Sequence, residues 1–204
     1  MQNDIEKIIN KHNDEEFIIL GTGPSINKFD FRCCNDKISL GCNGIGFLYI
    51  PDYYLIFDQF AYNKYGHLYE ASKSKKILGS WINSDIYDYK LWYDLKDSFG
   101  FSKSKIFHSK SVGFIALNIA YIMGARKIYL IGIDGYNQKK IHFHEDSEDI
   151  IQKVNNDWTE EKKELFIKSF SYALKILNKE GIELINYSTD SILNEIIPTV
   201  KCYE

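Results

Sequence analysis

Short apolar runs recur along the whole chain and alternate with segments that have the pattern of helices. Several of these runs are apolar at consecutive positions, which is typical of strands that are covered on both faces. The runs that we interpret as strands occupy residues 17–20, 37–42, 53–57, 75–79, 104–108, 127–132 and 182–186. Because strands and helices alternate so often, we predict an α/β fold, a Rossmann-like and mostly parallel sheet with helices on both faces.

Two helical segments are the clearest. Residues 111–125 are apolar almost all round, so a helix there would be buried. Residues 159–181 begin with Thr159 as an N-cap and two acidic residues, and end at Gly181. Residues 137–157 are polar, follow a strand and carry little hydrophobic pattern, so we expect a lid or a loop insertion there.

The composition is that of one globular domain. Of the 204 residues, 45% are hydrophobic and 26% are charged, which is enough to bury a core. The chain has no Pro/Gly/Ser-rich linker and no internal repeat, so we expect a single α/β domain over residues 1–204. The formal net charge of −3 provides no basic field for nucleic acid, and we expect no nucleic-acid partner.

The sequence also bears on localisation and on metals. Residues 1–16 lack the basic and apolar regions of a signal peptide, and the apolar stretch 112–125 is too short to span a bilayer. We therefore expect a cytoplasmic protein without a transmembrane segment, while peripheral membrane association and a homo-oligomer stay open. None of the four cysteines has CxxC spacing, so no zinc site is indicated.

Small or polar residues follow five of the predicted strands. In an open α/β sheet, ligands bind outside the carboxyl ends of the strands, so these residues are candidates for one shared crevice. They are Gly21, Thr22, Gly23, Pro24 and Ser25 after the first strand, Asn43 after the second, Asp58 and Gln59 after the third, Val112 and Gly113 after the fifth, and Gly132 and Asp134 after the sixth. We predict that this set binds a nucleotide.

The turn GTGPS, residues 21–25, is the first of these strand ends. Its glycines allow close backbone approach, and Pro24 at the start of a helix leaves the following N–H groups pointing outward. Such a helix start favours a phosphate, whereas the simpler alternative is a tight strand-to-helix turn capped by Ser25. Ile26 stands where a dinucleotide fingerprint needs a third glycine, and no Gly-Lys-Ser/Thr follows, so neither that fingerprint nor a P-loop is present.

Five segments of the chain resemble two related groups of proteins. The segments are GTGPSI, CNGIGF, PDYYLIFDQF, SVGFIALNIAYIMGARKIYLIGIDGY and GIELINYSTDSILNEI, of which GARKIYLIGIDGY is the most specific piece. One group is glycosyltransferase family 42, the bacterial sialyltransferases of lipooligosaccharide synthesis. The other is the MptE-like group (domain DUF115), which includes flagellin-glycosylation proteins and a pterin pyrophosphokinase.

The resemblance to family 42 implies a GT-A variant that transfers a sugar from a CMP-activated donor to a glycan acceptor, without a metal or another cofactor. It places this chemistry in the synthesis of bacterial surface glycans. Carried over motif by motif, it implies that Thr22, Ser25 and Asn43 face the nucleotide, that Gly113 lies beside ribose or phosphate, that Asp134 lies at the base or the sugar, and that Tyr136 donates a hydrogen bond to the departing phosphate.

The chain also departs from the sialyltransferases. Thr22 stands where they have asparagine, and NNDWTEE lacks the catalytic histidine that they carry in this region. GYNQKKIHFH instead resembles the MptE-like group, in which a histidine follows the Asp-containing strand end. A second function is therefore an Mg²⁺-dependent diphosphotransferase of the 6-hydroxymethylpterin pyrophosphokinase type, with Asp58, Asp134 and His142 around the metal. A third is a nucleotide-binding module without catalysis.

His142 and His144 are, with Tyr136, the candidate catalytic residues. A histidine titrates near neutrality, so either could accept the proton of an acceptor hydroxyl. Because they are two residues apart, both would lie on one side of an extended segment. The alternatives are a solvated loop, or a metal pair completed by Glu145 or Asp146.

Overall fold

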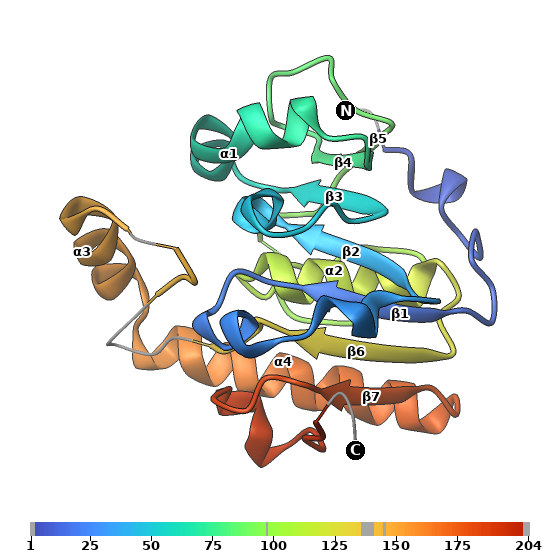
Figure 1. Cartoon of the computed structure of the whole chain (residues 1–204). Helices are drawn as coiled ribbons and strands as arrows, with labels where there is room; N and C mark the ends of the chain where they lie inside the picture. Colours follow the sequence, from blue (N-terminus) through green and yellow to red (C-terminus); the bar gives the residue numbers. More distant parts are fainter. Residues whose placement is uncertain (1–2, 97, 136–140, 145, 202–204) are drawn as a thin grey trace.

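The computed structural model describes residues 3–96, 98–135, 141–144 and 146–201. Within them, one seven-stranded sheet has the order β5-β4-β3-β2-β1-β6-β7, and every pairing between its strands is parallel (Figure 1). The predicted α/β fold is thus confirmed. The strands are β1 (Glu16–Leu20), β2 (Ile38–Cys42), β3 (Tyr53–Ile56), β4 (Lys75–Gly79), β5 (Tyr89–Leu91), β6 (Lys127–Ile131) and β7 (Glu183–Asn186).

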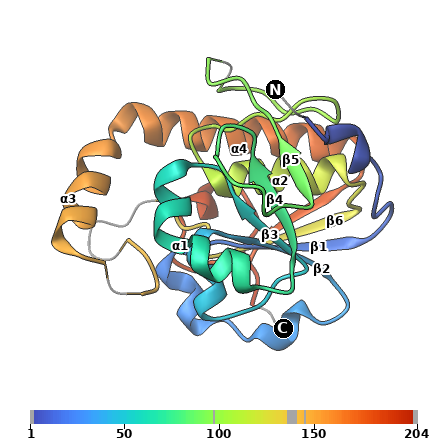
Figure 2. The same cartoon turned by 90° about the horizontal axis from the view of Figure 1, so that it is seen from above.

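Helices cover both faces of the sheet. Figure 2 shows α2 and α4 on one face and α1 on the other. None of the helices formed by the described residues is long and apolar enough to cross a membrane. The α-helices are α1 (Gln59–Ala71), α2 (Val112–Ile122), α3 (Glu148–Asp157) and α4 (Glu160–Lys179), and the short 3₁₀ helices are η1 (Ile5–Lys7), η2 (Pro24–Lys28), η3 (Phe31–Cys34), η4 (Asn43–Phe47) and η5 (Ile192–Glu195).

The central position of β1 in the sheet explains why its sequence is apolar at consecutive positions. Phe17 and Ile19 belong to the core beneath α2 and α4, whereas Ile18 and Leu20 belong to the core on the side of α1. All four side chains are fully buried. Since successive side chains of a strand point to opposite faces, a strand covered on both sides has no position for a polar residue.

The predicted strand over 104–108 is wrong. Ile106 forms only an isolated bridge with Tyr93, and the N–H of Phe107 donates to Asn118 Oδ1 of α2 at 3.0 Å. The fully buried side chain of Asn118 also donates to the Ser102 carbonyl at 2.7 Å. A side chain of α2 therefore takes the place of a neighbouring strand as the partner of this segment. At this edge of the sheet, next to β4, the outer strand is β5, which the apolar pattern did not indicate.

The polar segment expected to be a lid or a loop insertion includes helix α3, which follows Ser147. Figure 1 shows α3 beside the carboxyl ends of the strands. Part of the segment is thus regular structure rather than loop, and its role as a lid stays a prediction. Residues 137–140 and 145 of this segment lie outside the described residues.

The N-terminus of α4 confirms the predicted cap, because Thr159 Oγ1 accepts a hydrogen bond from the N–H of Lys162 at 3.3 Å. We expect Thr159→Ala to lower the free energy of unfolding by about 1 kcal/mol and Thr159→Ser to lower it far less, since serine also caps. Urea denaturation of the two variants checks this. An equal loss in both would show that the hydroxyl is not the stabilising group.

Candidate functional site

A cavity of about 300 Å³ lies at the carboxyl end of the sheet, at the low end of the range for small-molecule sites. It sits where the strand order changes direction, since β1 has β2 on one side and β6 on the other. Ligands bind at such switch points in open α/β sheets. The lining residues are Gly21, Thr22, Gly23, Asn43, Asp58, Lys110, Ser111, Val112, Gly113, Gly132, Ile133, Asp134, Gly135, Ile141, His142, Val154, Trp158 and Phe166.

Most of the residues predicted from the strand ends meet in this cavity. Four of the predicted residues do not line it, namely Pro24, Ser25, Gln59 and His144. Gln59 is exposed, and its side chain donates to Asn63 Oδ1 along α1 at 2.8 Å. Tyr136 lies outside the described residues, so its bond to a departing phosphate stays a prediction.

The glycines of the GTGPS turn serve the contact between two loops. A Cβ on Gly21 would lie 2.2 Å from the carbonyl oxygen of Gly132, and one on Gly23 would lie 2.5 Å from Asp134 Oδ2. The N–H groups of both glycines extend the pairing of β1 with β6, at 2.8 Å to the carbonyls of Ile131 and Gly132. The close approach that the sequence indicated is therefore made by protein, from the loop after β6.

Asp134 occupies the position expected for a phosphate at this turn. Its carboxylate accepts the N–H of Ser25 at 2.9 Å and also the Ser25 hydroxyl. Ser25 is 4% exposed and η2, which begins at Pro24, is only a five-residue 3₁₀ helix. Ser25 thus positions Asp134 instead of lining the cavity, and the helix start predicted to bind an anion binds this side chain. Asp134, 5% exposed, is the polar group that the turn presents to the cavity.

Burial raises the pKa of Asp134, and the hydrogen bonds from Ser25 and Ser188 oppose that shift. Ser188 is itself fixed, because its Oγ accepts the N–H of Gly132 at 2.9 Å. Two strand ends and the segment after β7 thereby hold one carboxylate in a single position. A carboxylate held in this way can accept hydrogen bonds from hydroxyl or amino groups of a ligand.

Asn43 has an unusual backbone and an unpaired side-chain oxygen. Its φ of 48° lies in the left-handed region, which asparagine tolerates better than most residues. Its Oδ1 is buried and has no hydrogen-bond partner among the described residues. Leaving a buried acceptor unpaired costs about 1–3 kcal/mol, so a ligand that donates a hydrogen bond here gains that energy.

The start of α2 supplies positive potential to the cavity. The helix is capped by Ser111, whose Oγ accepts the N–H of Phe114 at 3.4 Å, and the N–H groups of a first helical turn have no partner inside the helix. Ser109 and Lys110 precede the cap with φ of 42° and 52°. Such strained residues cluster at functional sites. Lys110 also lines the cavity, and nothing in the sequence indicated this, because an exposed lysine belongs to no recognisable pattern.

In the described part of the loop after β6, the two candidate histidines lie side by side, although residues 141–144 are bends and not the extended segment assumed from their spacing. The rings of His142 and His144 stack with centroids 5.1 Å apart and planes 14° from parallel. Phe143 between them is 7% exposed, and its N–H donates to the Thr22 carbonyl at 2.9 Å. Phe143 thus anchors the loop to the GTGPS turn, with His142 at the cavity.

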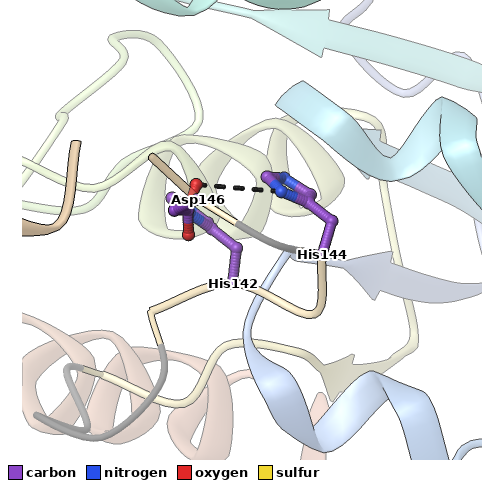
Figure 3. Close-up of side chains that lie close together, drawn as sticks. All are labelled: His142, His144 and Asp146. Carbon is purple, nitrogen blue, oxygen red and sulfur yellow. Dashed lines mark hydrogen bonds and ion pairs between the residues drawn. The ribbon is translucent and has the colours of Figure 1, made fainter. Parts of the chain in front are cut away.

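Asp146 joins these histidines in a polar cluster (Figure 3). His142 Nδ1 lies 2.7 Å from Asp146 Oδ2, and Lys64 Nζ of α1 lies 3.0 Å from Asp146 Oδ1. Burial lowers the pKa of His142, and the hydrogen bond to Asp146 only partly opposes this. Burial alone would raise the pKa of Asp146, but the hydrogen bonds from Lys64 and His142 outweigh it and lower that pKa. At neutral pH the pair is therefore a neutral imidazole beside a carboxylate.

Apolar side chains form the remaining wall of the cavity. Val154 comes from α3, Trp158 from the residue after it, and Phe166 from α4. The rings of Trp158 and Phe166 meet edge to face with centroids 5.7 Å apart. These residues could not be predicted from the sequence, because apolar residues in a helix have the same pattern whether they face a core or a ligand.

No protein-family model matches the chain, and no curated protein does. Several solved structures match over most of its length. The sialyltransferase CstII from Campylobacter jejuni, in complex with the substrate analogue cytidine-5'-monophosphate, has a TM-score of 0.61 and 20% identity, covering 93% of this chain and 86% of that one. The monofunctional alpha-2,3-sialyltransferase Cst-I from Campylobacter jejuni has a TM-score of 0.61 and 19% identity, covering 95% and 83%.

A third match is the MAf glycosyltransferase from Magnetospirillum magneticum AMB-1, with a TM-score of 0.59 and 14% identity. The match covers 96% of this chain but 35% of that one. Identities at this level are evidence of a common fold. The chain therefore has the α/β fold found in these glycosyltransferases, in line with the resemblance to sialyltransferases in its motifs.

Proposed function

We propose that this protein transfers a sugar from a CMP-activated donor to a glycan acceptor, without a metal, in the assembly of bacterial surface glycans such as lipooligosaccharide. One observation carries the proposal. The cavity at the switch point is lined by the polar strand ends, and the fold is shared with a sialyltransferase described in complex with cytidine-5'-monophosphate.

The lining of the cavity suits a nucleoside monophosphate. The unpaired Oδ1 of Asn43 would accept a hydrogen bond from the base or the ribose, and the carboxylate of Asp134 would accept another. The first N–H groups of α2 and the ammonium of Lys110 would stabilise the departing phosphate. A monophosphate carries less charge than a diphosphate, so these groups can serve it without a divalent cation.

His142 would act as the general base for the acceptor hydroxyl. Its Nδ1 is engaged by Asp146, which leaves Nε2 to accept a proton, and it lines the cavity. A carboxylate behind an imidazole fixes the tautomer and stabilises the imidazolium that forms, as in the Ser-His-Asp triad. The lowered pKa of His142 keeps the base neutral at pH 7.

A thermal-shift panel of CMP, UDP, GDP and ATP, each with and without Mg²⁺, tests this proposal. We expect CMP to raise the melting temperature in the absence of Mg²⁺. At a hundred times its dissociation constant, a ligand stabilises the folded protein by about 2.7 kcal/mol, which such a panel detects. An unchanged melting temperature with CMP at millimolar concentration would refute the hypothesis that the donor is a CMP-sugar.

Asn43→Gly sharpens the test, because glycine keeps the left-handed backbone and removes only the side chain. We expect it to weaken CMP binding about tenfold, through the loss of one buried hydrogen bond. Without CMP, the free energy of unfolding of the variant should fall by less than the binding energy that is lost, because the substitution also removes a buried acceptor that has no partner among the described residues. Gln59→Ala is the control, because Gln59 faces Asn63 rather than the cavity. Equal CMP affinity in Asn43→Gly and wild type would exclude this contact.

One observation favours the Mg²⁺-dependent diphosphotransferase as a second candidate. Asp58, Asp134 and His142, the residues that it would use around the metal, all line the same cavity. Asp58 and Asp134 already have partners, because Asp58 accepts the N–H of Ala61 as N-cap of α1 and Asp134 accepts Ser25. If only ATP with Mg²⁺ raises the melting temperature, this second function replaces the first.

A further inference from the structure

We propose that His142, His144 and Asp146 form a binding site for a divalent transition metal, which we call the His-His-Asp site. Each residue offers one ligand atom, and these atoms lie within 4.8 Å of one another. Figure 3 shows the three side chains converging from one short stretch of the chain. The proposal concerns binding and stands independently of the transferase reaction.

The distances in the cluster are close to those of a metal site. His142 Nδ1 lies 2.7 Å from Asp146 Oδ2, and His144 Nδ1 lies 3.7 Å from Asp146 Oδ1. Metal–ligand bonds of 2.0–2.2 Å in a tetrahedral site put ligand atoms roughly 3.3 Å apart. The observed distances lie on either side of this value, so small side-chain rotations would complete the arrangement.

The protein holds the ligands in place from two directions. Phe143 is buried between the histidines, and its backbone is tied at both ends, with its N–H on the Thr22 carbonyl at 2.9 Å and its carbonyl accepting Asn27 Nδ2 at 3.3 Å. His144 Nε2 lies 3.1 Å from the hydroxyl of Tyr65 on α1. An outer partner on the second ring nitrogen is the usual way in which a protein orients a metal-binding histidine.

The donor set selects the kind of metal. Two imidazole nitrogens and one carboxylate suit Zn²⁺, Co²⁺ or Ni²⁺, whereas Mg²⁺ prefers oxygen ligands only. Three protein ligands leave at least one position for water or another ligand, as in catalytic rather than structural zinc sites. The His-His-Asp site shares His142 with the Mg²⁺ site that a diphosphotransferase would need, but its other two ligands and its preferred metals differ.

Lys64 is the competitor of the metal. Its ammonium lies 3.0 Å from Asp146 Oδ1, and its side chain is 25% exposed. A divalent cation near this carboxylate would repel the ammonium, which can swing into solvent. We therefore expect that removal of the Lys64 charge tightens metal binding.

Metal binding and general-base catalysis exclude one another at His142. A neutral imidazole carries one proton, so a metal on Nδ1 places that proton on Nε2 and leaves no acceptor there. In the metal-free cluster, Asp146 accepts the Nδ1 proton, so Nε2 of the neutral imidazole carries no proton. A bound metal should therefore inhibit sugar transfer. This inhibition rests on the proposed function, whereas metal binding does not.

Titration of the metal-stripped, full-length protein with Zn²⁺ by calorimetry, and with Co²⁺ by visible absorption, tests the proposal without any substrate. We expect one metal per chain and a Co²⁺ spectrum of nitrogen and oxygen ligands. His144→Ala and Asp146→Asn should each weaken binding at least about tenfold, the scale seen when groups around a metal are altered. Lys64→Met should strengthen it.

His67→Ala is the matched control, because His67 is an exposed histidine outside the cluster. The affinity of this variant for the metal should equal that of wild type. Circular dichroism of every variant confirms that the fold is retained. The proposal is overturned if wild type binds no metal at millimolar concentration, or if His144→Ala and Asp146→Asn bind as wild type does. Because no nucleotide is present, the failure of metal binding and the failure of CMP binding are separate results.

Discussion

Gly21→Ala is expected to lower the free energy of unfolding by roughly 3 kcal/mol or more, beyond the usual effect of overpacking. The added Cβ would lie 2.2 Å from the carbonyl oxygen of Gly132, a distance that no side-chain rotation can relieve. The loops after β1 and β6 would have to separate, and these loops form one side of the cavity. Urea denaturation measures the loss, and CMP binding should fall with it.

Gly66→Ala is the control for this substitution. Gly66 lies inside α1, and the atoms nearest to an added Cβ there belong to Tyr62, at an ordinary contact distance of 3.6 Å. Because alanine is the better helix former, we expect this variant to be more stable by about 0.5–1 kcal/mol. A small effect at Gly21, comparable in size to the one at Gly66, would show that the two loops can move apart without cost.

The second large effect concerns catalysis and rests on the proposed function. We expect His142→Ala to lower kcat by about 100-fold or more, the usual contribution of a general base, with a smaller change in KM for the donor. The assay is release of the nucleoside monophosphate from the donor whose nucleotide stabilises the protein. His67→Ala, an exposed histidine on α1, should keep the wild-type rate. A wild-type rate in His142→Ala would assign the base to another residue.

The pH profile gives a further readout of the same residue. A base must be neutral, so the rate should fall as the pH drops through the pKa of His142, which burial holds below its ordinary value of 6.5. Asp146 raises that pKa by its hydrogen bond and its charge. Asp146→Asn should therefore move the acid limb of the profile to lower pH. A purely structural role of Asp146 would change the rate without moving the limb.

The parallel sheet could be predicted because its physical cause is local. A strand buried on both faces must be apolar at consecutive positions, and Phe17 to Leu20 are. The wrong prediction of a strand over residues 104–108 also has a clear physical cause. Asn118 is a fully buried polar residue in a mostly apolar helix, and its Oδ1 accepts the hydrogen bond from the N–H of Phe107 that a neighbouring strand would otherwise have accepted. Which groups satisfy a backbone N–H depends on contacts that periodicity does not contain.

The sequence by itself determined that polar residues would gather at one edge of the sheet, because parallel strands joined by helices all end on the same side. Only the tertiary structure decided which of those residues face a ligand. Glycines at 21 and 23 permit close approach by any partner, and the partner is the loop that carries Gly132 and Asp134. That loop lies more than a hundred residues further along the chain, and folding alone brings its carboxylate to the N–H of Ser25.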